Sequence, residues 1–237
     1  VDTVKEEWRA RLTMEISLNK KTLIDAVVYE LNDSLLQSIA NKNTAFAYVK
    51  KGMVYSNESI NNELDRLVEL FRANGYYYFT KEKIFTEVDT LNQQLMELSL
   101  DPLEQINQVL DAEKTQQDYP LWKLSFQLRN SSKNEFKQYP TGQQIFYTDL
   151  KLSDNPDTVL AKGLPNQESY KNIIQHYTKY TFKSPLFEEQ SIIKKGDLFN
   201  ENAYFQTLNN FSSLGPWQQV DARTTLQNDS VYLHYFL

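Results

Sequence analysis

The chain contains no cysteine among its 237 residues, and it has only two histidines and six glycines. The absence of cysteine excludes disulfides, thiolate nucleophiles and cysteine metal sites. The histidines, His176 and His234, stand in no recognisable spacing with a Ser/Asp pair or with other metal ligands, so neither a histidine triad nor a zinc site is predicted. So few glycines leave no glycine-rich phosphate loop. We therefore expect no cofactor.

Long apolar runs and clusters of basic residues are also missing. No run approaches the roughly 20 apolar residues that a membrane helix needs. The formal net charge is −6, the sequence pI is near 5.1, and lysine and arginine are scattered, so nucleic acid is not an expected partner. The N-terminus, Val1-Asp2-Thr3, has neither a start methionine nor a signal-like apolar core, and we expect a piece of a longer protein.

One phrase of the sequence occurs twice. Lys50-Lys51-Gly52 precedes a helical stretch that ends at Gly75, and Lys194-Lys195-Gly196 precedes another that ends near Gly215; aromatic residues follow both of these final glycines. Two copies of one supersecondary unit indicate a modular array, and such arrays more often bind than catalyse. Turns and helix stops are the roles predicted for Gly52, Gly75, Gly196 and Gly215.

Hydrophobic periodicity predicts the first elements of the chain. Arg9 to Leu18 alternates strictly between apolar and polar side chains, as a half-buried strand does. A β-rich run from Thr22 to Leu31 follows, and Asn32-Asp33-Ser34 supplies N-cap residues for a short helix. The next helix carries an apolar stripe that must pack on a sheet. The stripe consists of Ile60, Leu64, Leu67 and Phe71.

Two more strands complete the first copy, and the second copy repeats the order. Strands predicted at 83–88 and 122–128 enclose a helical insertion at about 91–119. In the second copy a strand is predicted from Gln144 to Leu152, and Asn166 is expected to cap a helix. That helix would present Tyr170, Ile173, Ile174 and Tyr177 on one face. The remaining predicted elements are a helix capped by Asn200 and a hairpin of Gln218–Thr224 with Val231–Leu237.

These elements suggest a division of the chain into domains. Residues 1–20 would be the terminal hairpin of a preceding unit, and residues 21–130 would form one domain that includes the insertion at about 91–119. A stretch rich in Asn, Ser and Lys at 131–142 is predicted to be a linker. Residues 143–237 would form the second domain.

Both copies resemble the POTRA domain, the polypeptide-transport-associated module. Their sequence motifs are similar to those of the BamA/TamA family of outer-membrane assembly proteins, particularly their TamA-like lipoprotein relatives. The phrases that carry the resemblance are Glu63 to Leu67, Arg72 to Phe79, Asp89-Thr90, Ile193 to Phe199 and Leu208 to Val220. The resemblance implies an α+β fold of tandem β-α-α-β-β domains. In each, two helices would cover one face of a three-stranded mixed sheet, with the strand after the second helix at its edge.

The resemblance also implies a function. The chain would be a non-enzymatic periplasmic scaffold of an outer-membrane protein assembly or translocation factor. Its partners would be unfolded outer-membrane protein substrates, other subunits of the assembly machinery, or a periplasm-spanning protein. Contact with the membrane would run only through a C-terminal barrel or an N-terminal lipid anchor outside this sequence.

An edge strand offers unpaired N–H and C=O groups to which another extended chain can add, a mode of binding called β-augmentation. Two strands are candidates for such docking. The candidate residues are Lys83, Ile84, Phe85, Thr86, Glu87 and Val88 in the first copy and Gln218, Gln219, Val220, Asp221, Ala222 and Arg223 in the second. Edges that are merely exposed, or covered by a neighbour, remain an equal alternative.

Two other functions are open from the sequence. A carbohydrate-binding module could stack sugars on the aromatic run Tyr76 to Phe79, although its place after a helix stop favours packing. A glycan hydrolase could use Glu188-Glu189 with Glu201 or Asp197, provided that two carboxyl groups lie about 5–9 Å apart across a cleft. A chain this acidic more often carries such residues on a solvated surface.

Overall fold

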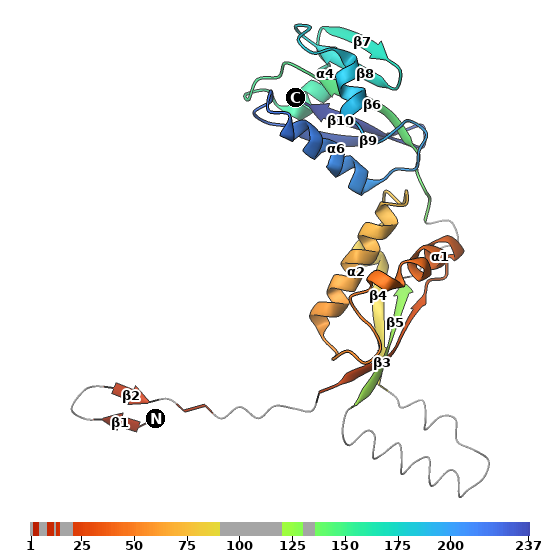
Figure 1. The fold of residues 1–237 in the computed structure, drawn as a ribbon, viewed down its shortest axis with the longest axis vertical. Helices are drawn as coiled ribbons and strands as arrows, with labels where there is room; N and C mark the ends of the chain where they lie inside the picture. Colours follow the sequence, from red (N-terminus) through yellow and green to blue (C-terminus); the bar gives the residue numbers. More distant parts are fainter. Residues whose placement is uncertain (1, 5–8, 12, 15–20, 91–119, 130–135) are drawn as a thin grey trace, which may run out of the picture. The chain divides into compact units, whose positions relative to one another are not determined.

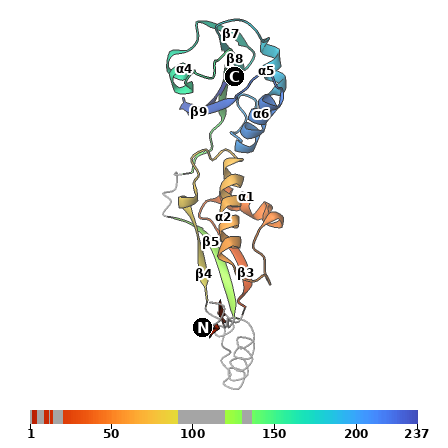
Figure 2. The same ribbon diagram turned by 90° about the vertical axis from the view of Figure 1, so that its left-hand side faces the viewer.

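The computed structural model describes residues 2–4, 9–11, 13–14, 21–90, 120–129 and 136–237 (Figures 1 and 2). The predicted insertion at about 91–119, most of the predicted hairpin at 1–20 and the first part of the predicted linker lie outside these residues. The chain divides into two compact units. The first unit is Val1–Val28, Lys50–Ser56 and Val88–Leu124; the second is Tyr29–Val49, Asn57–Glu87 and Ser125–Leu237.

The N-terminal part of the chain contains two sheets. Strands β1 (Asp2–Val4) and β2 (Arg9–Arg11) form an antiparallel pair. A three-stranded sheet has the strand order β3-β5-β4, so β3 and β4 are its edges. The elements of this region are β3 (Leu23–Glu30), α1 (Ser34–Lys42), the 3₁₀ helix η1 (Thr44–Phe46), α2 (Asn57–Arg72), the 3₁₀ helix η2 (Lys81–Lys83), β4 (Ile84–Asp89) and β5 (Leu121–Leu128).

Local sequence explains where α1 begins, which face of α2 is buried and where α2 ends. The Asp33 carboxylate accepts hydrogen bonds from the backbone N–H groups of Leu35 and Leu36, which caps α1. The four residues of the predicted stripe on α2 are all buried. Gly75, with φ 94°, follows the helix in the left-handed conformation that ends many helices.

The C-terminal part of the chain contains a five-stranded sheet with the order β7-β8-β6-β10-β9. It is mixed, because β6 runs parallel to both β8 and β10, whereas β7 and β9 run antiparallel to their neighbours. Its elements are β6 (Thr141–Tyr147), α4 (Pro156–Lys162), β7 (Asn166–Tyr170), β8 (Ile173–Tyr177), α5 (Ser184–Gln190), α6 (Glu201–Ser213), β9 (Asp221–Gln227) and β10 (Ser230–Phe236).

Helices cover both faces of this sheet. Successive residues of a strand point to opposite faces, and on β6 Phe146 joins one core cluster while Tyr147 joins another. The larger cluster packs the sheet against α5 and α6, with Phe187 and Phe211 fully buried. The smaller cluster packs the opposite face against α4 through Val159.

The three-stranded sheet with its helices and the five-stranded sheet with its helices share one design. The order β3-β5-β4 of the three-stranded sheet matches the order β6-β10-β9 within the five-stranded sheet, and in both the strand that follows the longest helix, α2 or α6, is at the edge. The predicted α+β fold with two copies of one β-α-α-β-β design is therefore confirmed. The second copy carries in addition α4, β7 and β8, inserted between β6 and α5. Its sheet therefore has five strands and helices on both faces, where three strands and helices on one face were predicted.

The repeated Lys-Lys-Gly phrase makes the same backbone contacts twice. In each copy the residue two positions after the glycine forms an isolated antiparallel bridge, Val54 with Leu23 and Leu198 with Pro140. Three hydrogen bonds of 2.7–2.9 Å surround each bridge. They run, donor first, from Gly52 to Ile24, Ile24 to Met53 and Tyr55 to Thr22, and from Gly196 to Thr141, Thr141 to Asp197 and Phe199 to Tyr139.

The helix predicted from Asn166 is wrong, because this segment is the β7–β8 hairpin. A turn at Lys171, with φ 50°, interrupts the segment, and the helical spacing of its apolar residues arises across that turn. Burial within β8 follows a period of two, since Ile173 and Gln175 are buried and their neighbours are half-buried. The strand predicted from Gln144 to Leu152 also differs, since β6 is Thr141–Tyr147.

Candidate functional site

The first group of predicted docking residues lies on β4 and just before it. Lys83 ends η2, and Ile84 begins the edge strand with its side chain buried. The side chains of Gln127, on β5, and of Arg129, just after β5, lie along this strand. The Gln127 side-chain amide donates to Glu87 Oε2 at 2.7 Å, and the Arg129 guanidinium lies 5.3 Å from the centre of the Phe85 ring.

The second group lies at the start of β9. Gln218, Gln219 and Val220 precede the strand, which begins at Asp221 and continues to Gln227. The strand predicted from the sequence, Gln218–Thr224, begins too early and misses the last three residues of β9. Its register with β10 is set by a two-residue turn, Asn228-Asp229, in which both residues have positive φ values of 48° and 58°. Such turns match the twist of a hairpin.

The outer edge of β9 has a definite hydrogen-bonding pattern. The N–H of Ala222 donates to Asp221 Oδ1, and its C=O accepts from Arg223 Nη1, so both groups point away from β10. Because directions alternate along an antiparallel strand, the backbone groups of Thr224 and Leu226 share this outward direction. The described residues provide no hydrogen-bond partner for these four outward groups.

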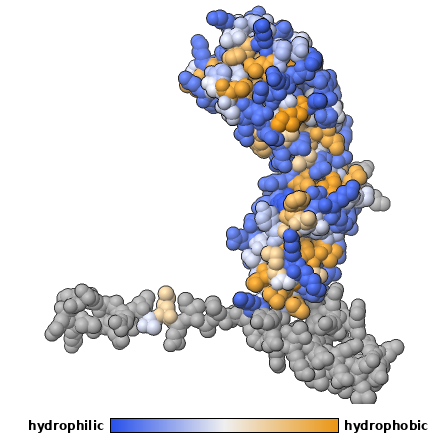
Figure 3. Space-filling model, viewed as in Figure 1, coloured by the Kyte–Doolittle hydropathy of each residue, from blue (hydrophilic) through white to orange (hydrophobic). Residues whose placement is uncertain are grey.

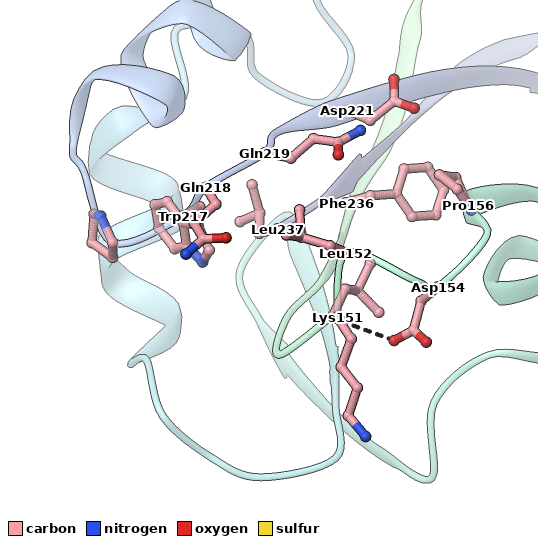
Figure 4. A pocket seen from close by; sticks show the side chains of 12 residues that line it. Lys151, Leu152, Asp154, Pro156, Trp217, Gln218, Gln219, Asp221, Phe236 and Leu237 are labelled. Atoms are coloured by element: carbon pink, nitrogen blue, oxygen red, sulfur yellow. Dashed lines mark hydrogen bonds between the residues drawn. The ribbon is translucent and has the colours of Figure 1, made fainter.

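A groove of about 440 Å³ opens beside the start of β9 (Figure 4). In this view Trp217 and Pro156 lie at opposite ends, and the exposed side chain of Leu152 lies between them. A hydrogen bond of 2.9 Å from the Lys151 N–H to Asp154 Oδ2 holds the loop that forms one wall. The residues that line the groove are Leu150, Lys151, Leu152, Asp154, Pro156, Pro216, Trp217, Gln218, Gln219, Asp221, Phe236 and Leu237.

The aromatic run after α2 does not form an exposed stacking platform. Tyr76 and Phe79 are 2% and 1% exposed, and only Tyr78 is more than half exposed. Tyr77 is half-buried, contacts the ring of Phe199 edge-on, and its hydroxyl lies 2.7 Å from Thr224 Oγ1 on β9. The run therefore serves mainly in packing. On the face drawn in Figure 3, apolar residues occur in several separate patches among polar ones.

The last residue of α2 and two residues just after the helix make polar contacts with α6 and with residues 138 and 139, all within the second unit. Arg72 forms an ion pair of 2.6 Å with Glu201, the first residue of α6. Burial raises the pKa of the Glu201 carboxyl, and the Arg72 charge opposes this rise. The Gly75 C=O accepts from the Tyr139 N–H at 2.9 Å, and the Gln138 amide donates to the Asn74 C=O at 2.8 Å.

Replacing Gly75 with alanine is expected to lower the free energy of unfolding by about 1–3 kcal/mol, because a left-handed conformation strains any residue with a side chain. Gly75 has φ 94°, and a Cβ atom there would lie 3.3 Å from both Gln138 Cβ and Leu198 Cδ2. Gly215→Ala is the matched control, since its φ is 80° but a Cβ atom would meet no atom within 4 Å. Urea unfolding should show the larger loss for Gly75→Ala; equal losses would contradict a role for this packing.

The carboxylates considered for glycan hydrolysis lie away from the groove. Glu188 forms an ion pair with Lys171 at 2.8 Å, and Glu201 pairs with Arg72. None of Glu188, Glu189, Glu201 and Asp197 lines the groove. Within the described residues, no three His, Cys, Asp or Glu side chains gather in a way that could hold a metal ion. No helix in the described ranges has the length and apolarity that crossing a membrane requires.

No protein-family model and no curated protein matches the chain. Solved structures do match. The structure of BamA from Haemophilus ducreyi lacking POTRA domains 1–3 matches with a TM-score of 0.47 and 10% identity, over 90% of this chain and 29% of that one. The chain is similar to solved POTRA-domain structures. Haemophilus influenzae BamA POTRA3-5 matches with a TM-score of 0.27 and 12% identity, over 92% of this chain and 96% of that one.

A third match is the N-terminal domain of Omp85 from the thermophilic cyanobacterium Thermosynechococcus elongatus. Its TM-score is 0.26 and its identity 10%, over 92% of this chain and 98% of that one. The chain spans less than a third of the Haemophilus ducreyi BamA chain.

Proposed function

We propose that this chain is a non-enzymatic periplasmic scaffold of an outer-membrane protein assembly or translocation factor, and that it docks extended segments of unfolded outer-membrane proteins on its edge strands. The observation that supports this best is the outer edge of β9, where the backbone groups of Thr224 and Leu226 point outward without a partner among the described residues. The tandem design of the fold and the POTRA-like phrases of the sequence point in the same direction.

Docking by backbone groups suits a scaffold that receives many sequences. An added strand bonds through its own N–H and C=O groups, which every residue except proline carries, so the affinity depends little on the guest's side chains. β4 is the second proposed docking edge. Residues 21–130 and 143–237 are the proposed domains, joined by a linker at 131–142. Other subunits of the assembly machinery, or a periplasm-spanning protein, are the proposed partners.

Disulfide trapping tests docking on β9 without background, because the natural chain has no cysteine. Leu226→Cys places a thiol on the partly exposed edge strand, and Ser213→Cys places one on the exposed end of α6 as a control. The probe is a short peptide from an outer-membrane barrel strand that carries one cysteine. We expect faster trapping by Leu226→Cys than by Ser213→Cys, and loss of the difference when the peptide backbone is N-methylated.

Two results would contradict docking on β9. Equal trapping at both positions would show that the peptide meets the thiols only by collision. Trapping that N-methylation does not reduce would show that backbone hydrogen bonds do not hold the peptide.

A further inference from the structure

The first part of β9 carries a pair of side chains that occupy its own outer edge. Asp221 Oδ1 accepts from the Ala222 N–H at 2.7 Å, and Arg223 Nη1 donates to the Ala222 C=O at 2.9 Å. The two side chains also bond to each other, with 2.7 Å between Arg223 Nη1 and Asp221 Oδ1. We call this arrangement the Asp221–Arg223 clasp.

The clasp occupies the groups that an added strand would use at this position. Ala222 lies opposite Tyr235 in the pairing with β10, and its two polar backbone groups face outward. The next residues with outward groups are Thr224 and Leu226, two and four positions further on. Their groups have no partner among the described residues, so the edge is closed at one end and open at the other.

We infer that the Asp221–Arg223 clasp sets the register and the length of the strand that β9 accepts. This inference rests on the proposed docking function. An extended polypeptide pairs with Thr224 and Leu226 and stops before Ala222, because further pairing requires it to displace both side chains. Proteins commonly shield edge strands with charged side chains, and here the shield covers one residue and leaves two open.

The clasp can open, because its residues are accessible and its charges can be screened. The Arg223 and Asp221 side chains are 45% and 30% exposed, and Arg223 has a second carboxylate within reach, Asp157 on α4, at 3.8 Å from its Nε atom. Interactions between exposed charges weaken as salt shortens the screening length from about 10 Å at 0.1 M to about 3 Å at 1 M. Higher salt therefore favours the open clasp and a longer added strand.

The experiment measures binding of the barrel-strand peptide, labelled with a fluorophore, by anisotropy at low and high salt. In Asp221→Ala/Arg223→Ala the outward groups of Ala222 are free, and we expect about three- to tenfold tighter binding, as one to two additional backbone hydrogen bonds would give. Binding to the natural chain should tighten as salt rises, whereas binding to the double variant should not. Lys171→Ala/Glu188→Ala removes a different exposed ion pair and should bind like the natural chain.

The outcomes separate the inference from the function on which it rests. Equal affinity and equal salt dependence for the natural chain and both double variants would overturn the clasp and leave docking in place. Absence of peptide binding to every protein would overturn docking and the clasp together. If the clasp variant does not fold, the salt dependence of the natural chain decides, since tightening with salt supports the clasp and its absence overturns it.

Discussion

Replacing Glu63 with alanine is expected to lower the free energy of unfolding by about 3–5 kcal/mol, the usual cost of leaving a buried charge without its partner. Glu63 is fully buried on α2. Its carboxylate accepts from the Tyr29 hydroxyl at 2.7 Å, from the Tyr48 N–H at 2.8 Å and twice from the Arg66 guanidinium. Burial, followed by the hydrogen bond to Glu63, raises the pKa of Tyr29, which keeps its hydroxyl a donor.

The loss arises mainly from the partners that Glu63→Ala leaves behind. The Arg66 side chain is only 12% exposed, so its charge would remain largely out of water with no carboxylate beside it. Replacing Glu63 and Arg66 together with leucine removes both charges and should cost less than Glu63→Leu alone. Urea unfolding followed by circular dichroism measures each loss.

Glu69→Ala is the control for this experiment, because Glu69 is exposed on the same helix and its removal should change stability by less than about 0.5 kcal/mol. A loss at Glu63 no larger than that at Glu69 would contradict a structural role for the buried carboxylate. A double leucine variant less stable than Glu63→Leu would contradict the account based on the unpaired charge.

Glu63 also shows which part of the fold could be predicted from the sequence. The stripe of apolar residues predicts α2 and its buried face, and Glu63 lies three residues after Ile60, within that face. Its charge nevertheless favours a position in water. The partners that make its burial tolerable come from Tyr29, 34 residues earlier, and from the backbone of Tyr48, and no local pattern reveals contacts over such distances.

The proposed docking edges illustrate the same limit. The repeated Lys-Lys-Gly phrase predicts two copies of one unit, because the turn it forms depends on a glycine with positive φ and on nearby backbone groups. The start of β9 was predicted three residues early, because a run of residues with high β-propensity does not show where the pairing with β10 begins. The clasp could not be foreseen, because Asp221 and Arg223 are ordinary surface residues until the strand direction brings both onto the edge of Ala222.

Lowering the pH is expected to destabilise the protein through His234, one of its two histidines. His234 is 3% exposed on β10, where its Nε2 lies 2.9 Å from Thr225 Oγ1 and its Nδ1 lies 3.4 Å from the Tyr147 hydroxyl. Burial, with a smaller contribution from the charge of His176, lowers the pKa of His234 to about 4. Burial also lowers the pKa of His176, whose ring stacks on Tyr147.

The sign of the effect follows from proton binding. An unfolded histidine has a pKa near 6.5, so between about pH 6.5 and 4 the unfolded chain binds more protons at His234 than the folded chain does. The contribution is complete above about pH 6.5 and is lost as the pH falls toward 4. A shift from 6.5 to about 4 corresponds to roughly 3 kcal/mol, at about 1.4 kcal/mol per unit.

The measurement is the free energy of unfolding in urea between pH 4 and pH 7 for the natural chain and for His234→Gln, whose amide can still bond to Thr225 and Tyr147. We expect the variant to lose the part of the slope between about pH 4 and 6.5 that His234 contributes, because glutamine does not titrate. His176→Gln should remove a smaller part, since His176 is only half-buried. Because the carboxylates titrate alike in all three proteins, the difference between their curves isolates the histidines, and parallel curves would show that neither ring is held neutral by burial.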